Sequence, residues 1–339
     1  MNKINNDVWV FIEQRDGTPA DVSFELLSKG RKIADNLKSE LKAVILGDKV
    51  QVLATQTFQF GVNEAIVYDH KDLAHYMTLP YSRLLSKLVS DEKPRVMLYG
   101  ATVIGRDLAP RVASFTKSGL TADCTDLQVS DVNYLRKDYK NLLLQIRPAF
   151  GGNIIATIIS PDVQTQMATV REGVMRMEKL DKPIEGRIRN IEYVADPIDS
   201  LVKLIEQHRK ENKVNLKAAP IIVAGGYGMK TKENFALIQE LANVIGGEVA
   251  GSRAAVDAGF IPSERQVGQT GVTVRPKLYI ACGISGAIQH RAGMQEANKI
   301  IAINSDPDAP IFGVAHYGIV GDVMEIIPRF INEFKLKLR

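Results

Sequence analysis

The chain has 339 residues, of which 45% are hydrophobic and 24% charged, and its formal net charge at pH 7 is +4. This length predicts two domains, and the ordinary globular composition excludes a disordered or fibrous protein. The small charge argues against nucleic-acid binding, and no apolar run approaches the ~20 residues of a membrane-spanning helix.

The cysteines and the start of the chain bear on the cellular compartment. Cys124 and Cys282 lie far apart, which excludes a disulfide framework and a cysteine-ligated iron–sulfur cluster within the chain. The first residues resemble a buried strand and show no basic-then-apolar export signal. We therefore expect a cytoplasmic protein.

The first half of the chain alternates apolar runs with amphipathic patterns. The runs predict strands at residues 8–13, 41–47, 64–69 and 94–102, and the helical periodicity predicts helices at 23–41, 75–91 and 106–118. Such alternation indicates a largely parallel sheet covered by helices, and hence an α/β fold.

The pattern changes after residue 120, where a β-rich stretch begins. From about 129 to 170, apolar segments follow one another without a helical spacer, which predicts an antiparallel addition around a glycine turn at Gly151–Gly152. Residues 188–196 are expected to form the last strand of this domain. A helix followed by a charged connector is expected over 200–220.

The domain boundary is expected in this connector, so that the domains cover residues 1–207 and 208–339. The second domain opens with a strand and a glycine loop at 219–229, which have the form of a nucleotide-binding turn. The segment lacks the complete Gly-x-Gly-x-x-Gly fingerprint, and a simple tight turn between strand and helix explains it equally well.

The segment GSRAAVDAGF, residues 251–260, is more specific. Ser252 can cap the helix that follows, and a helix start with free N–H groups also attracts an anion. Arg253 faces the positive end of the helix dipole, an unfavourable position that a bound anion or an electron-rich ring would offset. The alternative is that Arg253 points to solvent.

The turn GQTG, residues 268–271, exposes backbone donors, while the Gln269 amide and the Thr270 hydroxyl suit the heteroatoms of a ring. An apolar strand is expected to follow at residues 272–282. Together with the other glycine-rich loops, this turn favours a dinucleotide cofactor as the ligand.

The strand ends in the small residues of CGISG, and a helix is expected at 287–294 with His290 about one turn into it. A glycine- and serine-rich helix start binds phosphate readily. A lone histidine on a helix is nevertheless more often structural than functional. Cys282 is expected to be a small buried strand residue and not a nucleophile.

No other catalytic pattern competes with a cofactor site. The five histidines are scattered without the spacing of a zinc motif, and neither a nucleophile elbow nor a P-loop is present. We therefore predict no catalytic residues and no metal site.

Taken in order, SRAAVDAG, GQTG, CGISGAIQH-x-AGM and AIN-x-DP-x-API resemble the alpha subunit of electron transfer flavoproteins. RPAFGGNIIATI (147–158) and VAHYGIVGD (314–322) also resemble this family, so the likeness covers essentially the whole chain. It implies FAD as the cofactor. It also implies an N-terminal domain similar to adenine nucleotide hydrolases, which pairs with a beta subunit, and a C-terminal doubly wound, DHS-like FAD-binding domain.

The resemblance implies a set of FAD contacts. It puts the Arg253 guanidinium near the isoalloxazine ring, Thr270 near flavin N5 and His290 at the pyrimidine carbonyl, whereas Asn304 and Asp322 belong to the ribose and adenine end. The complete set is Tyr227, Ser252, Arg253, Val267, Gly268, Gln269, Thr270, Ser285, Gly286, Ala287, Ile288, Gln289, His290, Asn304, Asp322 and Val323.

The residue types agree with one-electron chemistry. Reduction places negative charge on the pyrimidine edge of a flavin, and a fixed Arg253 cation with a His290 donor stabilises that charge. Two positions depart from the family. Tyr227 stands where many relatives have arginine, and His316 stands where aspartate is common, which leaves open a charge contact at the cofactor and the local pairing.

The resemblance implies a redox carrier that is not an enzyme by itself. It would take single electrons from flavoprotein dehydrogenases, such as acyl-CoA dehydrogenases, to an acceptor. A narrower version acts with NADH and ferredoxin in electron bifurcation, through a second FAD in the beta subunit. The alternative from another class is an NAD-binding subunit of a dehydrogenase or transhydrogenase.

Overall fold

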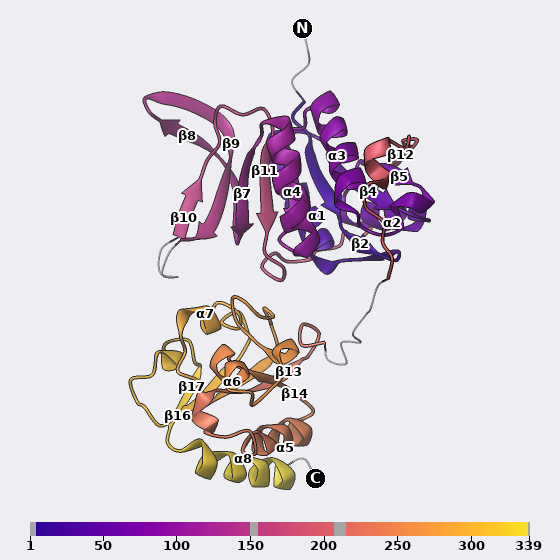
Figure 1. Ribbon diagram of the computed structural model, residues 1–339. Coiled ribbons are helices and arrows are strands. Elements are labelled where there is room, and N and C mark those ends of the chain that lie inside the picture. The colour runs from indigo at the N-terminus through magenta and orange to yellow at the C-terminus, as the bar shows by residue number, and fades with distance from the viewer. Residues whose placement is uncertain (1–4, 150–154, 207–214, 338–339) are drawn as a thin grey trace. The chain divides into compact units, whose positions relative to one another are not determined.

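The computed structural model describes residues 5–149, 155–206 and 215–337. The chain forms two compact units, Met1–Gln207 and His208–Arg339. Both are built on parallel sheets, which confirms the predicted α/β class (Figure 1). The glycine turn expected at Gly151–Gly152 lies outside the described residues.

The first unit contains a seven-stranded parallel sheet in the order β12-β5-β4-β1-β6-β11-β7. Its central strands are continuous apolar runs because helices cover both faces. The strands are β1 (Val8–Ile12), β4 (Leu41–Gly47), β5 (Glu64–Asp69), β6 (Val96–Gly100), β7 (Gly119–Cys124), β11 (Gln166–Val170) and β12 (Arg187–Asn190). A small hairpin, β2 (Gln14–Arg15) and β3 (Thr18–Pro19), follows β1.

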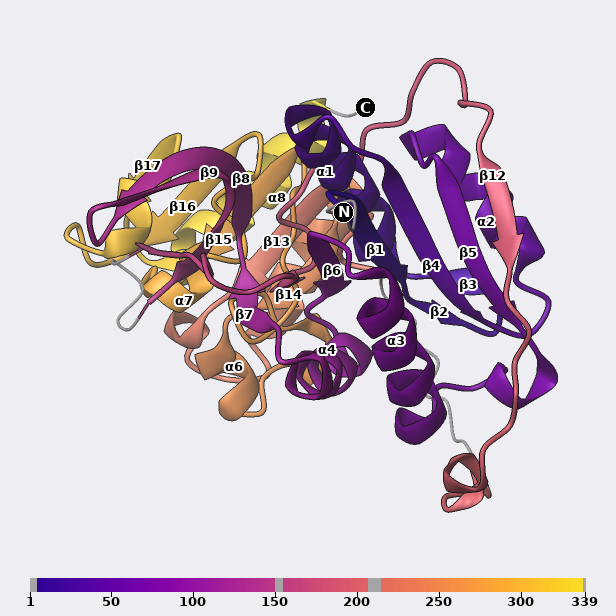
Figure 2. The ribbon, with the colours of Figure 1, turned by 90° about the horizontal axis from the view of Figure 1, so that it is seen from above.

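Helices cover the two faces of this sheet in pairs. The helices α1 (Asp21–Leu37) and α2 (Gln51–Thr57) pack on one face, and α3 (Thr78–Glu92) and α4 (Val103–Thr116) pack on the other. Figure 2 shows α1 on one side of the sheet and α3 and α4 on the other. The predicted helices are therefore present, with ends shifted by a few residues.

A three-stranded antiparallel sheet follows β7 in the chain. It consists of β8 (Asp126–Tyr134), β9 (Lys137–Pro148) and β10 (Ile155–Ile158), in the order β10-β9-β8. The expected antiparallel addition is confirmed here. It was expected to extend to residue 170, which is wrong, because β11 returns to the main sheet and pairs in parallel with β6 and β7.

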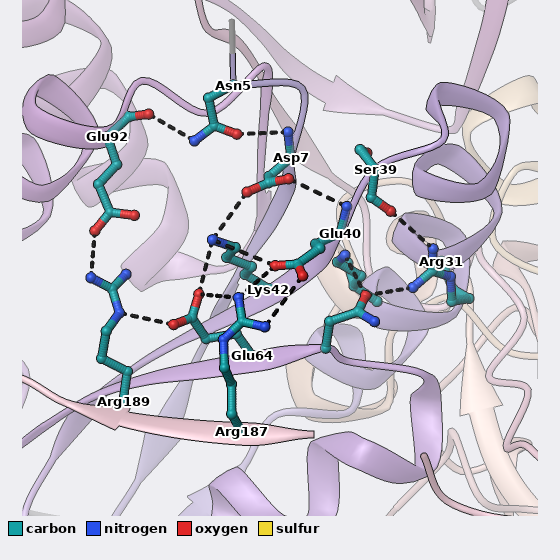
Figure 3. A network of polar contacts seen from close by, with 12 residues as sticks. Asn5, Asp7, Arg31, Ser39, Glu40, Lys42, Glu64, Glu92, Arg187 and Arg189 are labelled. Atoms are coloured by element: carbon teal, nitrogen blue, oxygen red, sulfur yellow. Dashed lines mark hydrogen bonds and ion pairs between the residues drawn. The ribbon is translucent and has the colours of Figure 1, made fainter. Parts of the chain in front are cut away.

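The last strand of the first unit is held by charge as well as by backbone hydrogen bonds (Figure 3). Lys42 is buried and pairs with Asp7 at 3.0 Å and with Glu64 at 2.8 Å. Arg187 and Arg189 of β12 reach the same Glu64 carboxylate, at 3.4 and 3.0 Å. Burial alone would raise the pKa of Glu64, but these cations outweigh it and lower the pKa.

Two expectations for the end of this unit are wrong. The strand expected at 188–196 ends at Asn190, and the described residues 201–206 form no helix. The apolar side chains of this segment are exposed, Ile205 to 97%. An amphipathic helix gains most of its stability from burying one face, and here the described structure offers that face nothing to pack against.

The second unit has a five-stranded parallel sheet in the order β14-β13-β15-β16-β17 (Figure 1). Its strands are β13 (Ile221–Gly225), β14 (Glu248–Gly251), β15 (Leu278–Cys282), β16 (Ile300–Asn304) and β17 (Tyr317–Val320). The helices α5 (Phe235–Ile245) and α8 (Val323–Lys337) cover one face, and loops with the 3₁₀ turn Pro310–Gly313 cover the other. The expected doubly wound arrangement is confirmed.

Two elements near the ligand loops are shorter than expected. The strand expected at 272–282 begins only at Leu278, and the helix expected at 287–294 is the single turn α7 (Ile288–Arg291). The helix α6 (Arg253–Asp257) is also one turn long. The chain between these elements is loop, and it packs at the carboxyl edge of the sheet.

Candidate functional site

The second unit has a cavity of about 690 Å³ at the carboxyl edge of its sheet. The cavity is lined by loops that follow β13, β14 and β15 and by Asn304 at the end of β16. The strand order reverses between β13 and β15, and open α/β sheets bind ligands at such a switch point. The topology therefore places the cavity where a ligand is expected.

Glycines bring the loops after β13 and β15 into contact. A Cβ atom on Gly226 would overlap the Gly283 carbonyl oxygen, and a Cβ on Gly228 would lie 2.8 Å from the Gly283 Cα. Gly283 itself has a φ of +63°, a conformation that favours glycine. These residues let two backbones pack directly and leave the space above them free for a ligand.

The loop after β14 contributes Ser252 and Arg253. The Ser252 hydroxyl accepts a hydrogen bond from the Ala255 N–H at 3.3 Å, so the predicted helix cap is confirmed. Arg253 lines the cavity with its side chain 70% exposed, and its Nε lies 3.5 Å from the Asp257 carboxylate. This ion pair offsets the unfavourable position of the cation at the helix start.

The GQTG loop is held against α7. The Gln269 N–H donates to the Gln289 carbonyl at 2.7 Å, and Gly293 packs so closely on Gly268 that a Cβ on Gly293 would lie 2.5 Å from the Gly268 Cα. The Gln266 amide donates to the Thr270 hydroxyl oxygen at 3.0 Å. Since that oxygen already accepts this bond, the Thr270 O–H remains free to donate toward the cavity.

His290 lies at the buried side of the cavity, where it is 6% exposed. Its Nε2 is 3.1 Å from the Tyr279 hydroxyl, and its Nδ1 makes no hydrogen bond to any described residue. Burial lowers the pKa of His290 to about 4, although the backbone of Val267 acts in the opposite direction. The imidazole is therefore neutral at pH 7 and carries one N–H.

The structure brings most of the predicted residues together. The predicted residues that line the cavity are Tyr227, Ser252, Arg253, Val267, Gly268, Gln269, Thr270, Ser285, Ala287, Gln289, His290 and Asn304. The remaining predicted residues, Gly286, Ile288, Asp322 and Val323, do not line it. Gly286 instead packs against the Ile311 backbone, and Val323 is buried in the core beside α5. Asp322 is at the start of α8, 3.2 Å from Lys230.

Several lining residues were not predicted: Gly228, Ala254, Asp257, Gln266, Gly283 and Ile284. Most are neighbours of predicted residues in the same loops, so the glycine-rich loops were the feature of the sequence from which these lining residues could have been predicted. Gln266 and Asp257 are different. Each acts by holding another lining residue, Thr270 or Arg253, and such pairings depend on the folded loop.

The structure shows the contacts of Tyr227 and His316, the two positions expected to depart from the family. The Tyr227 ring is stacked on Phe260, with centroids 5.9 Å apart, and remains 65% exposed at the cavity. It adds an aromatic surface there and no charge. His316 lies outside the cavity, and its Nδ1 accepts a hydrogen bond from the Ile300 N–H at 3.1 Å. It therefore joins β16 to the start of β17.

The residues of this cavity fit a flavin nucleotide. A buried donor without a partner at His290, free hydroxyl and amide groups at Thr270 and Gln269, and glycine-lined walls suit a large ligand with a polar edge. The charged lining residues are Arg253 and Asp257. A five-stranded parallel sheet with such a cavity at its switch point defines a nucleotide-cofactor-binding protein of the doubly wound class.

Comparison with known proteins identifies the family. Residues 8–197 match the electron transfer flavoprotein domain, and residues 215–295 match the electron transfer flavoprotein FAD-binding domain. The chain belongs to the alpha-subunit family of electron transfer flavoproteins, and FAD is the cofactor of its second domain.

Similar proteins match along nearly their whole length. An electron transfer flavoprotein subunit alpha of Thermoanaerobacterium thermosaccharolyticum is 49% identical over 97% of this chain and 98% of the relative. One from Clostridium acetobutylicum is 46% identical over 99% of both. The acryloyl-CoA reductase electron transfer subunit beta of Anaerotignum propionicum is 42% identical over 97% of this chain and 95% of the relative. The family assignment thus rests on both units.

Proposed function

We propose that this chain is the FAD-carrying subunit of a two-subunit electron transfer flavoprotein, and that it passes single electrons between a flavoprotein dehydrogenase and an acceptor. The observation that carries this proposal is the switch-point cavity, which is lined by the Arg253 cation and by His290, whose buried Nδ1 has no hydrogen-bond partner among the described residues. The relative named as an acryloyl-CoA reductase electron transfer subunit supports an acyl-CoA dehydrogenase as the redox partner.

The lining residues have separate tasks in this proposal. When bound, FAD supplies a ring that takes up and releases electrons one at a time. Arg253 contributes the fixed positive charge that stabilises negative charge on the ring, and His290 contributes a neutral hydrogen-bond donor. Thr270, held by Gln266, directs its hydroxyl to the same ring, and Gln269 directs its side-chain amide there.

Other predicted residues hold the remainder of the cofactor. Residues 285–289 address the diphosphate, and Asn304 addresses the ribose and adenine end. For Asp322, Val323, Gly286 and Ile288, which do not line the cavity of the free chain, contact with FAD remains a prediction. Asp322 pairs with Lys230, which follows the glycine loop after β13, and this pairing supports a contact of Asp322 with an extended ligand.

The state of His290 supports an electron carrier over an acid–base enzyme. A general acid or base works best with a pKa near the working pH, whereas burial lowers the pKa of His290 to about 4. The histidine therefore keeps its proton count constant around neutral pH. Its N–H then stabilises charge in the same way throughout that range.

We further propose that the first unit pairs with a beta subunit and that the complex works in the cytoplasm. The names of the relatives support a beta partner, and the two cysteines, which are free and buried, suit a reducing compartment. Within the described residues, no helix is both long enough and apolar enough to cross a membrane.

Purification with the beta subunit tests the proposal. We expect a yellow complex with one FAD held by this chain, and a folded but colourless complex would contradict the proposal.

The variant Arg253→Ala should largely keep FAD but lower the potential of the first electron in a stepwise reductive titration. Lys335→Ala, which removes another exposed, ion-paired cation far from the cavity in sequence, is the matched control. An unchanged potential in Arg253→Ala would remove the role assigned to that residue.

A narrower form of the proposal adds NADH and ferredoxin, which would exchange electrons through a second FAD in the beta subunit. Anaerobic mixing of the complex with NADH decides this form, since bifurcation requires that NADH reduce the flavins. No reduction would reject bifurcation and leave the simple electron carrier in place. The NAD-binding alternative is disfavoured by the FAD-binding family match, and a flavin spectrum of the purified complex separates the two.

A further inference from the structure

The buried pair of Tyr279 and His290 decides where the histidine proton is located. Tyr279 is on β15 and is 0% exposed, with its hydroxyl 3.1 Å from Nε2 of His290. The two rings are tilted, with centroids 6.1 Å apart, so the contact is through these two atoms and not through ring stacking. Among the described residues, His290 Nε2 is the only hydrogen-bond partner of the Tyr279 hydroxyl.

Two arrangements of the protons are available to this pair. If Nε2 carried the imidazole proton, it would donate to the phenol oxygen. The tyrosine O–H would then have no acceptor among the described residues, and the Nδ1 lone pair would also be unused. If the tyrosine donates to Nε2, the phenol O–H is satisfied and the imidazole proton is at Nδ1.

Each arrangement leaves one donor and one acceptor of the pair without a described partner, but the second joins the more acidic donor, the phenol O–H, to the more basic acceptor, the imidazole nitrogen, and is therefore favoured. Burial raises the pKa of Tyr279 well above its usual value, so the phenol keeps the proton that it donates. The remaining unpaired donor is the Nδ1–H, on a side chain that lines the cavity. A ligand acceptor at that position would complete the network.

We propose that Tyr279 is a positioning residue, which donates to Nε2 of His290 and thereby fixes the imidazole proton on Nδ1 as a donor to an acceptor atom of the bound cofactor. The position of the proton follows from this chain's own contacts. The use of that donor rests on the proposed function.

Nitrogen NMR of the FAD-loaded complex tests the proton position directly. With this chain labelled with ¹⁵N-histidine, and with the His290 signals assigned by their loss in His290→Gln, the two tautomers have distinct nitrogen shifts. We expect a protonated Nδ1 and an unprotonated Nε2 in the unmodified protein. A protonated Nε2 would overturn the proposal, and the tautomer itself is read in the unmodified protein, since His290→Gln serves only to assign the signals.

Tyr279→Phe then tests the cause, because it keeps the ring and removes only the hydroxyl. In the complex freed of FAD, where no cofactor acceptor holds Nδ1–H, we expect the His290 proton to move wholly or partly to Nε2. In the loaded complex we expect the potential of the first electron to fall while FAD content is retained. Tyr99→Phe is the matched control, since Tyr99 is an equally buried tyrosine in the first unit. An unchanged tautomer in Tyr279→Phe would show that something else sets it.

A double substitution separates positioning from general packing. If Tyr279 acts through His290, then Tyr279→Phe should change the potential no further once His290→Gln is present. Additive shifts would contradict the proposal. Loss of the proposed function would be seen separately, as a complex without FAD, and the tautomer of His290 can still be measured in such a complex.

Discussion

The parallel sheet of each unit has a point at which the strand order reverses, but different groups occupy these two switch points. In the first unit the strand order reverses between β1 and β6, and in the second between β13 and β15. At the first, the buried Glu13 carboxylate contacts the Thr102 hydroxyl, which also caps α4. At the second, glycines leave a cavity of about 690 Å³. The switch point of a parallel sheet therefore offers a position for a ligand, and the residues around it decide whether protein side chains or a cavity occupy that position.

Burial shifts the pKa in opposite directions at the two switch points, because one group is an acid and the other a base. It raises the pKa of Glu13, although the Thr102 hydrogen bond acts in the opposite direction, and it lowers the pKa of His290. In each case burial favours the neutral form. The Glu13 carboxyl group is already hydrogen-bonded to the protein, whereas the neutral imidazole of His290 retains a nitrogen without a described partner.

Adding a side chain at the glycine contact beside the second switch point should have the largest effect on stability and on FAD retention. In Gly226→Ala the new Cβ would overlap the Gly283 carbonyl oxygen, so the loops after β13 and β15 must separate. We expect a loss of about 2–3 kcal/mol of unfolding free energy, with FAD retention reduced more than tenfold. Denaturant titration and FAD content measure the two effects. Gly246→Asn, at an open left-handed position, is the control and should retain FAD.

Acid should destabilise the second unit through His290. The pKa of this residue falls from 6.5 to about 4 on folding, so the unfolded chain binds the proton more readily. The stability that the neutral histidine contributes is complete above pH 6.5 and is lost as the pH falls toward 4, by up to about 3 kcal/mol. Denaturation of the second unit across this pH range measures the loss. A slope that is the same in His290→Gln would contradict it.

Removing one helix cap from each edge should separate stability from cofactor binding. Thr102→Ala removes the cap of α4 and the partner of Glu13, and should destabilise the first unit by about 1–2 kcal/mol. Fluorescence of Trp9, the single tryptophan of the chain, reports that unit. Ser252→Ala should mainly weaken FAD retention, since Ser252 lines the cavity. Equal effects of both variants on FAD would break the comparison.

The smallest effect is expected at Asp257. Asp257→Asn removes the exposed ion pair with Arg253 and should change the unfolding free energy by less than about 0.5 kcal/mol. Because the Arg253 charge is then less compensated, the potential of the first electron should rise slightly. Reductive titration beside Arg253→Ala checks the sign. A fall in potential would mean that Asp257 is needed to orient Arg253.

The elements that could be predicted from sequence are those whose signal is local. The strands Leu41–Gly47 and Glu64–Asp69 have the predicted ends, because strands buried on both faces are continuous apolar runs. The Ser252 cap was predictable because it needs only its own helix turn. The helix expected from residue 200 is wrong, because periodicity does not show whether an apolar face finds a partner.

The amino-acid sequence by itself determined the α/β class, the glycine-rich loops and the side chains available to a flavin. Only the tertiary structure decided which of those side chains meet. The order of the strands brings the ends of β13 and β15 together, and that contact unites Arg253, Thr270 and His290 around one cavity. The partners Gln266 and Tyr279 became visible in the same way. Hydrogen bonds across loops depend on distances in space, which the spacing of residues along a chain does not contain.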